Sequence, residues 1–240
     1  MVEDARRGPE QIELGDLRVK LDQMTERIVS RFKDRLRFPM NEVVYETDGV
    51  HIAGRSGISF LQFALEGLEN YHASLGRFDY PDQYPVLGVK LPTSSVERVV
   101  DQAPLPKLSI NISDSLLPFY RDLLSKYCEH KNDPDSYGET VYIDADLLQI
   151  INERINIGRY VAEVKARKDP TIFGNTSDES TLLSKLKDKN REEALIVKVR
   201  NTAEAYELNP ELAEDAFRWM IDETIFVEIS YIQQVNETRR

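Results

Sequence analysis

Two cations lie on one apolar face of a predicted helix. In the segment RINIGRYVAEVK, residues 154–165, Arg154 and Lys165 are eleven residues apart. At ~100° per residue this is three turns plus only ~20°, so both side chains point the same way, ~16 Å apart along the axis. An unpaired buried cation costs several kcal/mol, so we expect an anion to bind them. The remaining residues of this face are apolar or small: Leu147, Ile151, Gly158 and Val161.

The nature of that anion is open from the residues alone. Carboxylates from neighbouring helices could pair with both cations, which would be a structural role. Alternatively, Arg154 as a planar fork and Lys165 as a point charge could hold a small molecule with more than one carboxylate. Gly158 lies midway between them and either leaves room for such a ligand or allows close helix packing.

Two further polar sets have helical spacing. Asp188, Arg191 and Glu192 share a face at i, i+3 and i+4, which is typical of a solvated surface with a weak ion pair. Thr224 and Glu228 are one turn apart on an apolar stripe. A carboxyl group there should have a raised pKa, unless it lies at a rim or pairs with a cation from another helix.

The sequence lacks the patterns of nucleophilic, metal or phosphate chemistry. There is no Ser/His/Asp or Cys/His arrangement, no phosphate-binding glycine loop, and the three histidines have no metal-ligand spacing. The lone Cys128 excludes an intramolecular disulfide and is typical of a small core residue. We therefore predict no metal and no cofactor, and an enzyme with these residues would act by clamping and electrostatics.

Length and charge narrow the class of protein. The chain has 240 residues and a formal net charge of −11, which argues against a nucleic-acid or anionic-membrane partner. No apolar run approaches the ~20 residues that span a bilayer, and the charged first residues do not resemble a signal peptide. We expect one cytoplasmic domain that covers residues 1–240.

Apolar residues recur at three and four positions along most of the chain, which predicts helices. We expect Asp144 to cap one helix, Asp169-Pro170 to end it, and Asn209-Pro210 to begin the last one. The predicted helices cover residues 11–36, 58–75, 114–130, 144–168, 177–189, 190–207 and 209–234.

Two segments are predicted to be irregular. Residues 81–118 carry six of the eleven prolines, which indicates a long Pro-rich connection with a short helix near Val96–Val100. The Asp, Pro and Gly residues of DPDSYGET, residues 133–140, predict a loop. Because no strand alternation and no repeat occurs, the predicted fold class is all-α, a single-domain helical bundle.

Several segments with characteristic sequences follow one another along the chain. They are DLRVKLDQM with VVYE, SFLQFALEGLE, RFDYPDQYP, SYGETVYIDADLLQ, RINIGRYVAEVK and DETIFVEISYIQQ. In this order they resemble segments of the all-helical chorismate mutases in the long form of yeast and plants, in which RINIGRYVAEVK resembles the signature helix. The resemblance covers about residues 14–234 and implies a helical homodimer. It also implies isomerisation of chorismate to prephenate in the shikimate pathway of aromatic amino-acid biosynthesis, without a cofactor.

The resemblance assigns roles to the charged residues of the signature helix and its neighbours. Arg18 and Arg154 match the cations that hold the two carboxylates of chorismate. Lys165 and Glu228 match groups that reach its ether oxygen, where negative charge grows as the C–O bond breaks.

Four other residues match substrate-binding positions. Glu192 matches the residue that binds the ring hydroxyl, and Thr224 one that helps to hold a carboxylate. Asp188 stands where the yeast form has Asn and the short bacterial form has Asp, and Arg191 resembles an arginine of the bacterial form.

The regulatory site of the long form matches only in part. There, an arginine pair helps to bind tyrosine or tryptophan at the dimer interface. Here Arg77 is present, but Gly76 replaces the first arginine. In the effector loop Gly138 matches, whereas Glu139 replaces a serine, and its carboxylate could repel the carboxylate of an effector or capture its amine. A tyrosine or tryptophan effector is thus an open expectation.

Two alternatives use the same scaffold. One is a catalytically silent helical protein that binds a metabolite, and the other is a mutase that acts on aminodeoxychorismate or isochorismate. Glu192 separates these substrates weakly, since it suits a hydroxyl or an amine donor. The joint presence of six matching residues favours the active mutase: Arg18, Arg154, Lys165, Glu192, Thr224 and Glu228.

Overall fold

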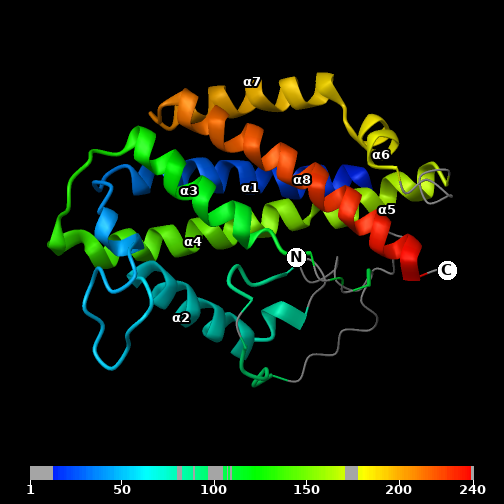
Figure 1. Ribbon diagram of the computed structural model, residues 1–240. Helices are drawn as coiled ribbons and strands as arrows, with labels where there is room; N and C mark the ends of the chain where they lie inside the picture. Colours follow the sequence, from blue (N-terminus) through cyan, green and yellow to red (C-terminus); the bar gives the residue numbers. More distant parts are fainter. Residues whose placement is uncertain are drawn as a thin grey trace.

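The regular structure of the described residues is helical, apart from one isolated bridge between Ile52 and Arg55. The computed structural model describes residues 13–79, 83–88, 90–96, 105–106, 108, 110–170 and 178–238. The all-α prediction is therefore confirmed (Figure 1). The elements are α1 (Leu14–Arg35), η3 (Glu42–Tyr45), α2 (Phe60–Ser74), η4 (Arg77–Asp79), α3 (Ser113–Tyr127), η5 (Pro134–Ser136), α4 (Tyr137–Asn156), α5 (Gly158–Lys168), α6 (Glu179–Leu186), α7 (Lys189–Ala205) and α8 (Pro210–Thr238).

The helices pack around α4 and α8. Helix α4 packs against α1, α2, α3 and α8, and α8 packs in addition against α5, α6 and α7. Helices α2 and α7 lie on opposite sides of this group (Figure 1). No described helix is long and apolar enough to cross a membrane.

Most helix boundaries lie close to their predicted positions. Of the helix predicted over 11–36, residues 11 and 12 lie outside the described part, as does residue 177 of the helix predicted over 177–189. The predicted start of α8 is confirmed, because the Oδ1 of Asn209 accepts a hydrogen bond of 2.9 Å from the backbone N–H of Glu211. Helix α8 extends beyond the predicted end at residue 234, to Thr238.

The prediction that Asp144 caps a helix is wrong. Helix α4 begins at Tyr137, so the predicted loop over 133–140 ends early, and Asp144 lies inside the helix, fully buried. Its Oδ1 accepts hydrogen bonds from the Nε of Arg35 at 2.6 Å and from the hydroxyl of Tyr120 at 2.7 Å. The hydroxyl of Tyr45 donates to its other oxygen. Asp144 thus pairs with the buried Arg35 of α1, although its residue type and local sequence predicted a helix cap.

The predicted helix over 144–168 is interrupted once, at Ile157. Helix α4 ends at Asn156 and α5 begins at Gly158, although Ile157 keeps near-helical backbone angles of φ −60 and ψ −22. The two sides of the break stay aligned along α8. The guanidinium of Arg154 lies over the ring of Phe217, and Lys165 pairs with Glu228, also eleven residues further along α8. The predicted shared face is therefore confirmed.

Buried polar side chains hold the irregular connection against the helices. Glu69 accepts hydrogen bonds from the backbone N–H groups of Val86 and Leu87. Arg159 donates to the carbonyl groups of Leu108 at 2.6 Å and Ile110 at 3.1 Å. The short helix predicted near Val96–Val100 lies outside the described residues, except for Val96.

Aromatic packing joins α3 to α8. The rings of Phe119 and Trp219 stack with centroids 4.1 Å apart and an interplanar angle of 6°. Trp219 is the only tryptophan of the sequence.

Candidate functional site

Arg154 is a buried cation that no described carboxylate binds. Its exposed fraction is 3%, and its guanidinium lies 5.0 Å from the centroid of the Phe217 ring. The Nε has no hydrogen-bond partner among the described residues. Burial lowers the pKa of Arg154 to about 10, against the opposing effect of Asp22. The guanidinium is thus desolvated and available to an anion.

Lys165, by contrast, already has a protein carboxylate. Its Nζ lies 2.9 Å from the Oε2 of Glu228 and donates a 2.8 Å hydrogen bond to the carbonyl of Leu186. Glu228 is only 4% exposed, and this burial raises its pKa although Lys165 acts to lower it. Glu228 thus pairs with a cation from another helix, which was the alternative to a raised pKa, and burial raises its pKa nevertheless. A carboxylate from a neighbouring helix therefore pairs with Lys165, as the structural alternative requires, but no described carboxylate does so with Arg154.

Gly158 serves close packing between α5 and α8. A Cβ atom at this position would lie 3.0 Å from both the Cγ2 and the carbonyl oxygen of Thr224, and 3.5 Å from the Cγ of Glu228. The hydroxyl of Thr224 donates to the carbonyl of Met220 at 2.6 Å. Contact with α8 thus explains this glycine without a ligand.

We predict that Gly158→Ala lowers the free energy of unfolding by ~1–3 kcal/mol, because the backbone of Thr224 cannot yield to the added methyl group. Denaturant unfolding measures the change. Gly138→Ala is the matched control, since Gly138 lies in the first turn of α4 and, apart from its chain neighbours and the backbone of its own turn, no atom lies within 4 Å of its Cβ position. That control should be neutral or stabilising. Equal losses in both variants would contradict the packing role.

The other candidate residues lie on α1 and at the start of α7. Arg18 is exposed, and partial burial together with this nearby cation lowers the pKa of Arg191. Glu192 is partly buried, with its Oε2 4.0 Å from the Nζ of Lys187. Asp188 lies outside α7 as its N-cap, where its Oδ1 accepts a 3.2 Å hydrogen bond from the backbone N–H of Arg191. The shared helix face predicted for Asp188, Arg191 and Glu192 is therefore wrong for Asp188.

Asp22 of α1 is a carboxylate near the candidate site that the sequence reasoning did not consider. Its negative charge acts to raise the pKa of both Arg154 and Arg191, against the larger effect of burial. It also forms a 2.9 Å ion pair with Lys198 of α7. Its position one turn after Arg18 on α1 was a signal that could have found it.

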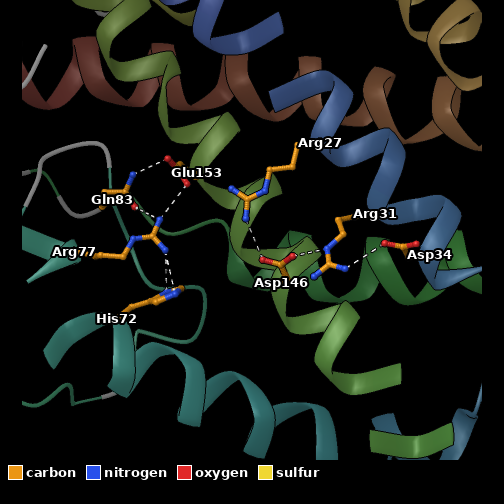
Figure 2. Close-up of polar contacts among 8 residues, drawn as sticks. All are labelled: Arg27, Arg31, Asp34, His72, Arg77, Gln83, Asp146 and Glu153. Carbon is orange, nitrogen blue, oxygen red and sulfur yellow. Dashed lines mark hydrogen bonds and ion pairs between the residues drawn. The ribbon is translucent and has the colours of Figure 1, made fainter. Parts of the chain in front are cut away.

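Arg77 is engaged by groups of its own chain (Figure 2). Its Nη2 donates to the Oε1 of Gln83 at 3.0 Å and lies 3.5 Å from the Oε2 of Glu153. Its Nη1 lies 3.1 Å from the Nε2 of His72, and partial burial together with Arg77 lowers the pKa of His72 to about 4. Arg77 is thereby linked to α4 at the residue before Arg154.

The other regulatory candidates lie elsewhere on α4. Gly138 and Glu139 belong to its first turn, not to the predicted loop. Glu139 precedes Glu153 by fourteen residues, which is ~21 Å along a helix. Between them Asp146 pairs with Arg31 and Arg27 of α1 (Figure 2). One chain therefore does not bring Arg77 together with Gly138 and Glu139.

Known proteins match both the sequence and the fold. The family model of type II chorismate mutases matches residues 137–229. The chorismate mutase of Schizosaccharomyces pombe is 30% identical over 168 residues, which are 68% of this chain and 66% of the relative. The crystal structure of chorismate mutase from Candida albicans in complex with L-Trp has a TM-score of 0.90 and 26% identity, covering 96% of this chain and 94% of the other. The structure of AtCM1 with tyrosine bound in its allosteric site has a TM-score of 0.82 and 26% identity, covering 93% and 96%.

Proposed function

The chain belongs to the all-helical chorismate mutases of the yeast and plant type, and we propose on this premise that Arg154, Lys165 and Glu228 form the centre of its active site. It is an isomerase that converts chorismate to prephenate. One observation supports the assignment of the centre above all. Arg154 is a buried cation without a described carboxylate partner, on the same face as the pair of a partly buried ammonium, Lys165, with the buried carboxyl group of Glu228.

In the proposed mechanism the enzyme acts on a single bound molecule. Arg154 and Arg18 hold the two carboxylates, so that the flexible substrate is folded into its compact reactive geometry. Lys165 and the protonated Glu228 donate to the ether oxygen as the C–O bond breaks and negative charge develops there. The 2.9 Å contact between these two groups supports this pairing, since both can reach one oxygen.

The remaining candidates surround this centre. We assign the ring hydroxyl of the substrate to Glu192. We assign one substrate carboxylate to Arg191 together with Arg18, and the effect of the Arg18 charge on the pKa of Arg191 supports this pairing. For Asp188 and Thr224, substrate contacts stay predictions, because the Asp188 carboxylate caps α7 and the Thr224 hydroxyl donates within α8.

We predict that the activity falls as pH rises and that Glu228→Gln flattens this profile. A carboxyl group donates a hydrogen bond only when it is protonated. Burial raises the pKa of Glu228, so the donor is present below that pKa and is lost as pH rises through it, whereas an amide donates at every pH. The measurement is kcat/KM for chorismate across the pH range.

The matched control for that prediction is Glu223→Gln. Burial also raises the pKa of Glu223, but its carboxylate accepts a hydrogen bond from Ser115 of α3. Its replacement should leave the pH profile unchanged. A Glu228→Gln variant that kept the wild-type pH dependence would contradict the proposed donor.

The assignment of substrate is tested with the wild-type protein. The assay follows the loss of absorbance of chorismate, with aminodeoxychorismate and isochorismate as comparison substrates. Chorismate should be consumed fastest, and a protein that consumed none of the three would overturn the proposed active site.

We also propose a homodimer that tyrosine or tryptophan regulates. This proposal is supported by the L-Trp complex of the Candida albicans relative and by the tyrosine in the allosteric site of AtCM1. Arg77 would contact the effector from one subunit, and Gly138 and Glu139 from the other, which the distance between them in one chain requires. A cytoplasmic location stays a prediction.

A further inference from the structure

The end of α6 and its junction with α7 contact three residues of the candidate site: Lys165, Arg191 and Glu192. Helix α6 ends at Leu186 and α7 begins at Lys189, so the junction consists of Lys187 and Asp188. The carbonyl of Leu186 accepts the 2.8 Å hydrogen bond from Lys165, and Asp188 caps α7 at Arg191. These contacts fix the backbone on both sides of Lys187.

Lys187 lies between two carboxylates from different helices. Its Nζ is 4.0 Å from the Oε2 of Glu192 on α7 and 3.9 Å from the Oδ1 of Asp222 on α8. The two carboxylates are thus no more than about 8 Å apart across the ammonium, which is within the screening length of physiological salt. Without the ammonium they would repel each other.

The two carboxylates differ in their exposure to water. The side chain of Glu192 is 20% exposed, whereas that of Asp222 is 72% exposed. Solvent weakens an ion pair with an exposed group more than one with a partly buried group. The attraction of Lys187 therefore acts mainly on the orientation of Glu192.

The backbone of Lys187 is anchored well enough to direct its side chain. Its N–H donates a 3.0 Å hydrogen bond to the carbonyl of Leu183, in the last turn of α6. Leu182 and Leu186 are buried on the same helix. The ammonium therefore extends from a fixed point toward α7 and α8.

We propose that Lys187 is a positioning residue that holds the carboxylate of Glu192 in place to accept the ring hydroxyl of the substrate. The proposal rests on the proposed function for the role of Glu192. A carboxylate is an acceptor in every orientation, but only a fixed one adds to binding without first losing rotamer freedom. Because a hydroxyl contact of this kind is made equally in the ground state and the transition state, its loss changes KM more than kcat.

The test is the Lys187→Met variant. We expect KM for chorismate to rise about three- to fivefold with kcat within about twofold, as for the loss of one partly exposed ion pair. Lys187→Arg should restore KM, because a guanidinium can also pair with the carboxylate. In a Glu192→Gln background, Lys187→Met should have no further effect, which a merely structural role would not produce.

Two controls isolate the contact. Asp222→Asn removes the other carboxylate and should leave KM within about twofold of wild type. Lys189→Met removes an exposed lysine two residues further along and should change neither constant.

The outcomes separate this inference from the proposed function. Normal wild-type turnover with an unchanged KM in Lys187→Met would overturn the inference alone, as would an equal rise of KM in the Glu192→Gln background. Unfolding of Lys187→Met at the assay temperature would also overturn it, because the lysine would then be structural. A wild-type protein without turnover would overturn the proposed function and this inference with it.

Discussion

Arg154→Met is expected to lower kcat/KM for chorismate by about 10²–10³ and to leave the free energy of unfolding unchanged or higher. The loss of activity follows because a planar, desolvated guanidinium makes two charge-assisted hydrogen bonds to a carboxylate, which methionine cannot replace. Stability is kept because Arg154 is buried without a described carboxylate partner, so its removal relieves the cost of a desolvated charge. Steady-state kinetics and denaturant unfolding of the same preparation measure both quantities.

Arg159→Met is the matched control for that experiment. Arg159 is fully buried on α5 and donates to the side chain of Asn156 and to the carbonyl groups of Leu108 and Ile110. Its removal leaves buried acceptors unpaired, so the control should lose stability. If Arg154→Met lost as much stability as Arg159→Met, Arg154 would be structural. If it kept its activity within about tenfold of wild type, the proposed contact with a substrate carboxylate would be contradicted.

Asp144→Ala is expected to lower the free energy of unfolding by ~3–5 kcal/mol, the largest loss of stability that we predict for a single change. The variant leaves the guanidinium of Arg35 buried and without its carboxylate, and both side chains of the pair are 0% exposed in the folded protein. Tyr120 and Tyr45 also lose the acceptor of their hydroxyl groups. Chemical denaturation at constant pH measures the loss.

Asp146→Ala provides the comparison from the same helix. Asp146 pairs with Arg31 at 2.6 Å and with Arg27 at 3.3 Å, but its side chain is 24% exposed (Figure 2). Water and salt screen such a pair, so the expected loss is at most ~1 kcal/mol. Similar losses for Asp144→Ala and Asp146→Ala would show that burial does not set the energy of the inner pair.

Properties that depend on local spacing were predicted from the sequence. The shared face of Arg154 and Lys165 follows from helical geometry and survives the break at Ile157, because that residue keeps near-helical backbone angles. The start of α8 at Asn209 is likewise a matter of neighbouring residues. The apolar stripe around Glu228 indicated the burial that raises its pKa, but not which cation pairs with it.

Properties that depend on distant partners were not predicted. Asp144 has the residue type of a helix cap, and its pairing with Arg35, 109 residues away in the chain, leaves no trace in the local sequence. Lys165 donates a hydrogen bond to the backbone carbonyl of Leu186, and no residue type in the sequence indicates such an acceptor. The choice between a ligand and close packing at Gly158 required the position of Thr224.

The stacked ring of Trp219 gives this protein an intrinsic optical probe. As the chain has one tryptophan, its fluorescence comes from a single place, where α3 and α8 meet. That place is two residues from Phe217, whose ring the guanidinium of Arg154 covers. Trp219 and Phe217 point to different faces of α8, so emission from the unlabelled protein reports the contact of α3 with α8 on a face that Arg154 does not cover.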